Sequence, residues 1–162
     1  MGNLSYSAPA PLEDSHRLED FFCTQPSLES WLKRTARKNH TRGASRVFVV
    51  VTGDRAVVGY YALSAGSVAR AVAPGRISRN TPEPIPVAVL GRLAVHHGHT
   101  GHGLGAGLLR DAVLRTQRLA REMGVRALLC HALDEQAQAF YLHHGFLTSP
   151  IEPLTLMLPL NP

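Results

Sequence analysis

The spacing of apolar residues along the chain predicts three helices. Apolar positions recur at helical intervals from Ser27 to Asn39, which predicts an amphipathic helix with a basic outer face and Ser27 as its N-cap. A second stripe predicts a helix that stops before Gly124, and its members are Leu108, Leu109, Val113 and Leu119. A third, short helix is expected from Asp134 to His144.

Runs of β-branched and other apolar residues predict the strands. Residues 45–53 and 56–66 flank a turn at Gly53-Asp54, so we expect an antiparallel hairpin. Residues 86–95, 125–133 and 154–160 predict further strands, and residues 145–150 a turn into another. Gly91 is interpreted as a bulge or a close backbone approach. Residues 68–86 lack a period and are expected to form a long loop with a short helix.

These elements, with a chain of 162 residues of which 44% are hydrophobic, predict one mixed α/β domain over residues 1–162. Residues 1–12 are expected to be extended or flexible. Cys23 and Cys130 lie in apolar surroundings and are predicted to be reduced thiols. No apolar run is long enough to cross a bilayer and no secretory signal precedes the domain, so we expect a cytoplasmic protein without a membrane partner.

The chain is basic, because its 17 Lys and Arg outnumber its 12 Asp and Glu and give a net charge of +5. One basic cluster contains Lys33, Arg34, Arg37, Lys38, Arg42 and Arg46. A second contains Arg70, Arg76 and Arg79. A solvated face explains many such runs. Two of them in a small domain favour a nucleic-acid partner.

The segment between the predicted strand at 86–95 and the following helix carries the clearest chemical signal. Gly101, Gly103 and Gly105 lie where a strand runs into a helix, so several backbone N–H groups and the positive end of the helix point to one place. Glycine permits positive φ and the close approach of a phosphate. The pattern predicts an anion site, and without a G-K-[ST] ending it is not a Walker A loop.

Two other interpretations of this segment are weaker. The glycines also satisfy G-x-G-x-x-[GA], but a dinucleotide site requires an acidic residue at the end of the next strand, where His131 and Ala132 stand. The histidines around the loop suggest a metal, yet no cysteine pair or carboxylate accompanies them. We therefore expect solvent-exposed loop histidines and no metal site, and the histidines concerned are His96, His97, His99 and His102.

Tyr141, on the last predicted helix, is the other candidate for chemistry. A lone tyrosine beside Phe140 is more often a core residue with a hydrogen-bonded hydroxyl. If an acyl group is transferred from coenzyme A, however, a thiolate leaves, and a positioned phenol can donate a proton to it.

The strand, the loop T-G-H-G-L-G, its helix and the segment A-F-Y-x-x-x-G-F together resemble the GNAT superfamily of N-acetyltransferases. The resemblance covers nearly the whole chain. The loop P-G-R-I-S-R-N and the end L-M-L-P-L are similar to the TacT-like toxins of type II toxin–antitoxin systems. It implies a GNAT fold, with a twisted, mostly antiparallel sheet, a splayed central strand pair and flanking helices.

The resemblance further implies an acyl-CoA N-acyltransferase that moves acetyl from acetyl-CoA to the α-amine of aminoacyl-tRNA and blocks translation. Direct transfer in a ternary complex would use Tyr141 as the general acid. The implied partners are a second copy of the chain, a ribbon-helix-helix antitoxin and, for the toxin–antitoxin complex alone, operator DNA. A free α-amine has a pKa of about 7.7 to 8, so a dedicated base is not required.

Carried over by motif, the strand segment Leu93, Ala94 and Val95 would hold the acetyl-pantetheine arm. The pyrophosphate would bind Thr100, Gly101, His102, Gly103, Leu104, Gly105 and Ala106. The two basic clusters would bind tRNA, with Arg76, Arg79 and Asn80 representing the second.

The chain departs from the family pattern at two places. Thr100 stands where Gln or Arg is usual, and His96–His99 follow Val95 where the family usually has an acidic residue next. Two other functions therefore stay open. One is acetylation of a small amine or a protein lysine, which needs an acidic acceptor cleft. The other is a weakly active protein that serves mainly to bind an antitoxin.

Overall fold

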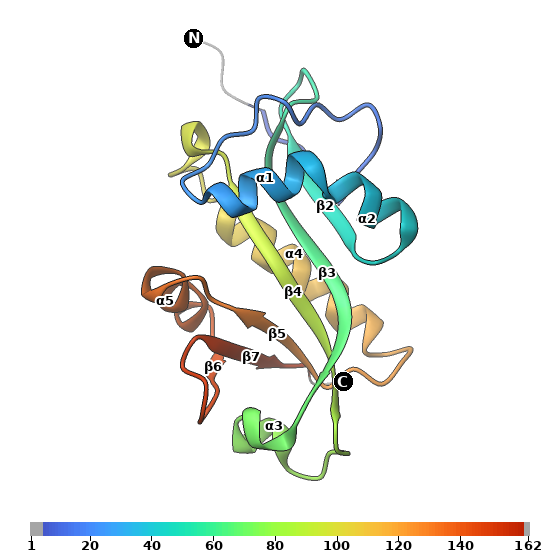
Figure 1. The fold of residues 1–162 in the computed structure, drawn as a ribbon, viewed down its shortest axis with the longest axis vertical. Coiled ribbons are helices and arrows are strands. Elements are labelled where there is room, and N and C mark those ends of the chain that lie inside the picture. The colour runs from blue at the N-terminus through green and yellow to red at the C-terminus, as the bar shows by residue number, and fades with distance from the viewer. Residues whose placement is uncertain (1–4, 161–162) are drawn as a thin grey trace. The chain divides into compact units, whose positions relative to one another are not determined.

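The computed structural model describes residues 5–160 and shows a mixed α/β fold (Figure 1). The strands are β1 (Ala10–Pro11), β2 (Arg46–Val51), β3 (Val57–Val68), β4 (Ile85–Val95), β5 (Ala127–His131), β6 (Leu147–Thr148) and β7 (Thr155–Pro159). The helices are α1 (Pro26–Arg34), α2 (Ala36–Arg42), α3 (Gly75–Ser78), α4 (Leu104–Leu119) and α5 (Glu135–His143), with 3-10 turns η1 (Arg70–Val72) and η2 (His97–His99).

Within the described residues the strands form one sheet in the order β1-β2-β3-β4-β5-β7-β6. Strands β1 and β2, β2 and β3, β5 and β7, and β6 and β7 pair antiparallel. Strands β4 and β5 pair in parallel, from Val87↔Ala127 to Leu90↔Cys130. The predicted mixed fold and the hairpin around Gly53 are confirmed.

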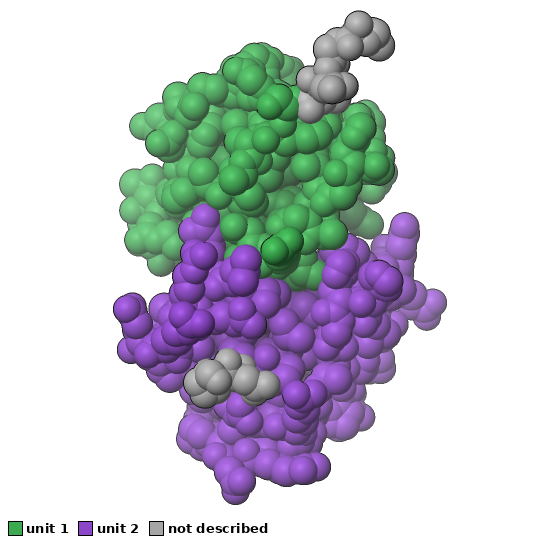
Figure 2. All heavy atoms as spheres, turned by 180° about the vertical axis from the view of Figure 1, so that it is seen from behind, with its two compact units in different colours: residues 1–63, 92–112 green, residues 64–91, 113–162 purple. Residues whose placement is uncertain are grey.

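The chain divides into two compact units, shown in two colours in Figure 2. Unit 1 consists of the chain up to Leu63 together with Arg92–Ala112, and unit 2 of Ser64–Gly91 together with Val113–Pro162. The long elements β3, β4 and α4 each contribute to both. The prediction of a single domain over residues 1–162 stays a prediction.

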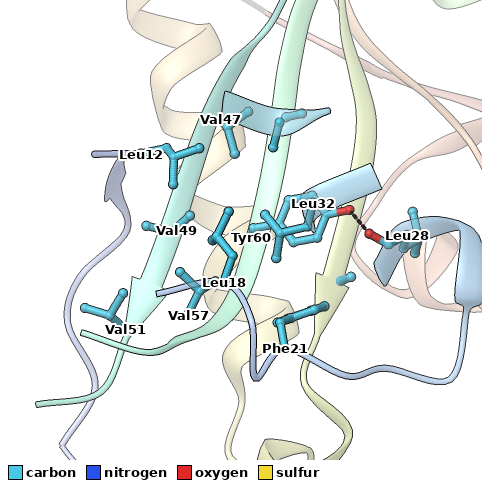
Figure 3. Close-up of a cluster of buried hydrophobic side chains, with 13 residues drawn as sticks. Leu12, Leu18, Phe21, Leu28, Leu32, Val47, Val49, Val51, Val57 and Tyr60 are labelled. Carbon is cyan, nitrogen blue, oxygen red and sulfur yellow. Dashed lines mark hydrogen bonds between the residues drawn. The ribbon is translucent and has the colours of Figure 1, made fainter. Parts of the chain in front are cut away.

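In unit 1, alternation along β3 sends neighbouring tyrosines to opposite faces of the sheet. Tyr60 is fully buried and its hydroxyl donates to the Leu28 carbonyl of α1 at 2.6 Å (Figure 3). Tyr61 instead donates to the Asp111 carboxylate of α4. The cluster around Tyr60 contains apolar side chains from α1, β2 and β3, so helix α1 covers this face of the sheet.

Unit 2 has its own buried cluster. Its members come from the segment after β3, from β4, β5 and β7: Ala73, Ile77, Ile85, Val87, Ala127, Leu129 and Met157. The short helix expected in residues 68–86 exists as α3, and Ile77 anchors it with no exposed surface. Because Ile77 packs into this cluster, the backbone that carries the arginines of α3 and of the residues after it is held in place.

The first predicted helix begins earlier than expected and is interrupted. Pro26 occupies the first helical position, where its missing N–H costs nothing, so Gln25 is the N-cap and the assignment of Ser27 was wrong. At Thr35 the backbone leaves helical dihedrals, with φ −122°, and α2 starts at Ala36. The second part then continues to Arg42 and ends at Gly43 with φ +77°.

Three further expectations need correction. Helix α4 ends at Leu119, because i→i−3 bonds such as Glu122 N–H to the Leu119 carbonyl tighten the next turn, so Gly124 is not its C′ residue. Leu119 itself is 41% exposed, although the apolar stripe included it. A Cβ at Gly91 would meet nothing within 4 Å, so no close approach occurs there. Of the two alternatives for residues 1–12, Ala10–Pro11 are extended and pair with β2, and Leu12 is buried, so the flexible alternative is wrong there; residues 1–4 lie outside the described part.

Candidate active site and basic surface

The predicted phosphate loop in unit 1 has the geometry of an anion site. It follows β4 and η2, and Gly101 and Gly103 adopt φ values of +82° and +77°. A Cβ at either glycine would meet no protein atom within 4 Å, so backbone conformation rather than packing requires glycine there. Gly107 N–H donates to the Gly103 carbonyl at 3.0 Å, which is the i→i−4 bond at the start of α4. The backbone amides of residues 104–106 precede this bond, at the N-terminus of the helix. These donors fit a pyrophosphate.

The strand segment expected to hold the acetyl-pantetheine arm lies at the end of β4. Ala94 is buried in the unit 1 cluster, and Leu93 and Val95 are half-buried. Just beyond them, His96 N–H donates to the Val58 carbonyl at 2.8 Å, which fastens the end of β4 to the start of β3. The backbone that enters the loop is thereby fixed.

His97 and His102 are exposed, as expected, whereas His96 and His99 are half-buried, which corrects the expectation for these two. His96 Nδ1 accepts from Gly98 N–H, so its proton lies on Nε2, which donates to the Asp20 carbonyl at 2.9 Å. His97 contacts the Phe22 carbonyl through its ring and its backbone. The Tyr6 hydroxyl lies 2.9 Å from His99 Nδ1. Together these bonds tie the N-terminal segment to the entrance of the loop.

The surroundings of His99 favour its neutral imidazole. Burial, followed by the charges of His96 and His102, lowers the pKa of His99. Within residues 5–160 no group of at least three His, Cys, Asp or Glu side chains is arranged to hold a metal ion.

Tyr141 lies on α5 in unit 2, and Asp134 caps this helix by accepting from Ala137 N–H at 2.8 Å, as the sequence predicted. Its side chain is 8% exposed and packs against Phe146, with ring centroids 5.3 Å apart. Burial raises the pKa of Tyr141, and the neighbouring Cys130 raises it further. The phenol is therefore fully protonated at neutral pH.

Both thiols are free, as predicted. Burial raises the pKa of Cys130 to about 12, so it is not a nucleophile. Burial likewise raises the pKa of Cys23, whose Sγ donates to the Gln25 carbonyl at 3.3 Å. Neither thiol is therefore a candidate nucleophile.

The first basic cluster separates into structural and exposed cations. Lys33 pairs with Glu29 at 3.7 Å and lies over the Phe22 ring. Arg37 donates to the His16 carbonyl, and Arg46 to the His40 carbonyl. Arg34, Lys38 and Arg42 are exposed, and their side chains form no ion pair or hydrogen bond within the described residues. Lys38 and Arg42 lie four residues apart on one side of α2, and Arg34 is the last residue of α1, before the break at Thr35.

The second cluster lies in unit 2. Arg76, Arg79 and Asn80 are exposed on and after α3, and Asn80 has φ +56°. Arg126 Nη2 donates to the Arg76 carbonyl at 3.4 Å. Arg70 pairs with Glu83 at 3.5 Å, so the cation nearest the start of this loop is partly neutralised.

Sequence reasoning missed Arg92, the polar residue inside the apolar strand β4. Its guanidinium lies over the Trp31 ring, 4.8 Å from the centroid, and Trp31 in turn stacks on Tyr60 with an interplanar angle of 9°. An arginine between two apolar strand residues was the available signal. The helix that contributes Trp31 could not be placed over β4 from sequence.

The sequence profile of the "Acetyltransferase (GNAT) family" matches residues 12–146, so the chain belongs to this family of acetyltransferases. The chain is 50% identical over 153 residues to the tRNA-acetylating toxin of Mycobacterium tuberculosis (strain ATCC 25618 / H37Rv), covering 94% of this chain and 92% of that one. It is 31% identical to the probable toxin TacT of Sinorhizobium fredii (strain NBRC 101917 / NGR234), covering 93% and 89%.

Several solved structures are similar to this fold over nearly its whole length. A Tyr-to-Phe mutant of KacT matches with a TM-score of 0.88 and 26% identity, covering 98% of this chain and 96% of that one. AtaT complexed with acetyl-methionyl-tRNAfMet matches with a TM-score of 0.86 and 27% identity, covering 97% and 95%. A Tyr-to-Phe AtaT mutant bound to acetyl-CoA and the C-terminus of the antitoxin AtaR matches with a TM-score of 0.81 and 26% identity, covering 98% and 94%.

Proposed function

We propose that this chain is a toxin that acetylates the α-amine of aminoacyl-tRNA with acetyl-CoA and thereby blocks translation. The observation that carries the proposal is its 50% identity, over nearly its whole length, to a tRNA-acetylating toxin. The exposed cations on α1 and α2 support a polyanionic acceptor. Acetyl-CoA is the only cofactor that the proposal requires.

In this proposal the loop Thr100–Ala106 binds the pyrophosphate of acetyl-CoA through its backbone amides. The thioester supplies the acetyl group and coenzyme A leaves as a thiolate. Leu93–Val95 orient the pantetheine arm, and the Tyr141 hydroxyl gives its proton to the leaving sulfur. Thr100, which lacks a long polar arm, leaves phosphate binding to the amides and to the positive end of α4.

The remaining partners follow from the same proposal. A homodimer is expected, and a ribbon-helix-helix antitoxin is expected to neutralise the toxin and to bring it to operator DNA. The AtaT relative bound to the C-terminus of AtaR supports an antitoxin partner. None of the helices within residues 5–160 is long and apolar enough to span a membrane. Because charged tRNA is cytoplasmic, we place the protein in the cytoplasm.

The test is transfer of labelled acetyl from acetyl-CoA to a mixed pool of charged tRNAs, followed by isolation of the labelled aminoacyl-adenosine. Label on the α-amine is the expected result. Label on a free polyamine or on protein lysine instead, with uncharged and charged tRNA both inert, would favour the small-amine or lysine alternative. Tight acetyl-CoA binding without transfer to any acceptor would favour the antitoxin-binding alternative.

The basic surface gives a quantitative prediction. Changing Arg34, Lys38 and Arg42 together to glutamine is expected to weaken tRNA binding and to reduce the slope of log affinity against log salt by about 0.7 to 0.9 for each lost phosphate contact. Binding would be measured by filter retention or anisotropy across a salt series, with acetyl-CoA affinity as the internal check.

Arg118 in α4 offers a matched control, because it is also exposed and without an ion pair in the described part of the chain. Arg118→Gln should leave the salt slope unchanged. If the triple variant and this control lose the same small amount of affinity, the charge effect is general and α1 and α2 are not the tRNA surface.

A further inference from the structure

Arg92 in unit 1 is a half-buried cation whose side chain forms no hydrogen bond or ion pair with the described residues. Its guanidinium lies over the Trp31 ring, 4.8 Å from the centroid, and Trp31 stacks on Tyr60. The Tyr60 hydroxyl is anchored to the Leu28 carbonyl at 2.6 Å. We call the side chains of Arg92, Trp31 and Tyr60 the arginine stack. It holds the guanidinium in place without neutralising its charge.

Other half-buried cations of unit 1 have acceptors within the protein. Arg17 pairs with Asp20 and Asp54, each at 3.1 Å. Lys33 pairs with Glu29 at 3.7 Å, and Glu29 also accepts from the backbone N–H of Cys23 at 3.0 Å. Glu29 is the acidic residue of α1, so this helix has no second carboxylate for Arg92. A charge that is partly removed from water and left unpaired is costly, and an anion that binds Arg92 removes this cost.

Strand β4 places Arg92 beside the segment that we propose for the pantetheine arm. Arg92 and Ala94 are two residues apart on β4, so both lie on the sheet face that α1 covers. The pairing of β4 with β5 ends at Leu90↔Cys130 within the described residues. If the pyrophosphate binds the loop after β4 and the arm follows Leu93–Val95, the thioester end of acetyl-CoA points away from the loop and toward Arg92.

Helix α1 connects the arginine stack to the exposed basic residues. Trp31 and Arg34 are three residues apart and are therefore neighbours on the surface of α1. Lys38 and Arg42 follow on α2. An RNA strand whose phosphates contact these exposed cations can extend its 3′ end to Arg92. A protein lysine or a small amine offers no phosphate to this guanidinium.

We propose that Arg92 is a specificity-determining residue that binds the phosphate of the 3′-terminal nucleotide of the acceptor tRNA, with Trp31 as its positioning residue. This inference rests on the transferase function proposed above. In an aminoacyl-tRNA the α-amine is carried by an ester on the terminal ribose, and the phosphate on the 5′ side of that ribose is the nearest anion. A guanidinium donates two parallel N–H bonds to one phosphate. The contact holds the terminal ribose and presents the α-amine to the thioester.

Two matched acceptors isolate this phosphate, namely an aminoacyl-adenosine, which lacks it, and the same aminoacyl-adenosine as its 5′-monophosphate. We expect the wild type to use the phosphorylated acceptor with a kcat/KM about 10-fold higher, the ratio that a charge-assisted hydrogen bond typically supplies. Arg92→Gln should use both acceptors about equally. Arg92→Lys should keep part of the preference, because lysine retains the charge and lacks the planar fork.

Charged tRNA gives a second readout. With Arg92→Gln, the slope of log affinity against log salt should fall by about 0.7, the value for one phosphate contact in a single strand. Trp31→Leu should reduce the preference for the phosphorylated acceptor in part, because the guanidinium is then no longer held by the ring. A merely structural role of Trp31 would lower the use of both acceptors equally.

Arg110→Gln is the control, because Arg110 is exposed on α4 in the same unit and has no ion pair within the described residues. It should keep the full preference between the two acceptors. The melting temperature of Arg92→Gln should stay near the wild-type value, since the substitution breaks no ion pair. Its dissociation constant for acetyl-CoA should also be unchanged.

An undiminished preference in Arg92→Gln, an unchanged salt slope, or equal losses with both acceptors would overturn the assignment and leave the transferase function standing. Weaker acetyl-CoA binding by Arg92→Gln, with S-acetylpantetheine used at the wild-type rate, would overturn it too, because the bound phosphate would then belong to coenzyme A. If the wild type transfers no acetyl to any charged tRNA, the proposed function itself fails, and the assignment of Arg92 fails with it.

Discussion

Replacing Tyr141 by phenylalanine is expected to lower turnover by about 10²-fold or more while leaving acetyl-CoA affinity nearly unchanged. The substitution removes one hydroxyl from a side chain that packs against Phe146 and is 8% exposed, so the ring contacts survive. Only the proton that meets the departing thiolate is lost. Single-turnover acetyl transfer, with acetyl-CoA binding measured by calorimetry, separates these two effects.

The elevated pKa of Tyr141 makes proton transfer from its hydroxyl to the thiolate less favourable. A phenol of ordinary pKa, about 10, is already a weaker acid than a thiol of pKa about 8.5, so complete proton transfer is uphill by roughly 2 kcal/mol. Burial increases that difference, because it disfavours the phenolate. We therefore expect the hydroxyl to act as charge develops on sulfur, with no free phenolate accumulating. The same buried phenol stays protonated over the whole working range of pH.

Phe146→Leu provides a matched comparison, since it changes the packing of Tyr141 and keeps the hydroxyl. It should reduce stability more than turnover. If Tyr141→Phe transfers acetyl at the wild-type rate, the tyrosine is a core residue and the leaving thiolate is protonated by water.

The second large effect is expected in the loop. Gly103→Ala should weaken acetyl-CoA binding about 10-fold, because Gly103 has φ +77° and an L-residue in that region costs about 1–2 kcal/mol. The loop must either bear that strain or rotate its amides away from the phosphates, and 1.4 kcal/mol corresponds to about a factor of ten in affinity. Isothermal titration with acetyl-CoA measures the change directly.

Gly107→Ala is the control, because Gly107 lies only four residues further on inside α4. A Cβ there meets nothing within 4 Å and the backbone is helical, so the variant should bind acetyl-CoA normally. It should also gain about 1 kcal/mol of stability from the higher helix propensity of alanine. Equal loss of binding in both variants would show that the loop geometry is not what recognises the phosphates.

The sequence determined the local features of this protein. β-branched runs defined β2 and β3, and Gly53-Asp54 defined their turn, because strand propensity and turn chemistry act between neighbours along the chain. The capping of α5 by Asp134 and the positive φ at Gly101 and Gly103 also follow from nearby residues. Family motifs then indicated the acetyltransferase class, which the family comparison confirms.

Tertiary structure decided what depends on residues far apart in sequence. No local pattern shows that Arg37 serves the His16 carbonyl while Arg34 faces solvent, because the difference arises from where α2 meets the N-terminal segment. The contacts of the loop histidines with Asp20 and Phe22 are of the same kind. The contact of Arg92 with Trp31 exists only once α1 packs against β4, since that packing brings together residues far apart in sequence.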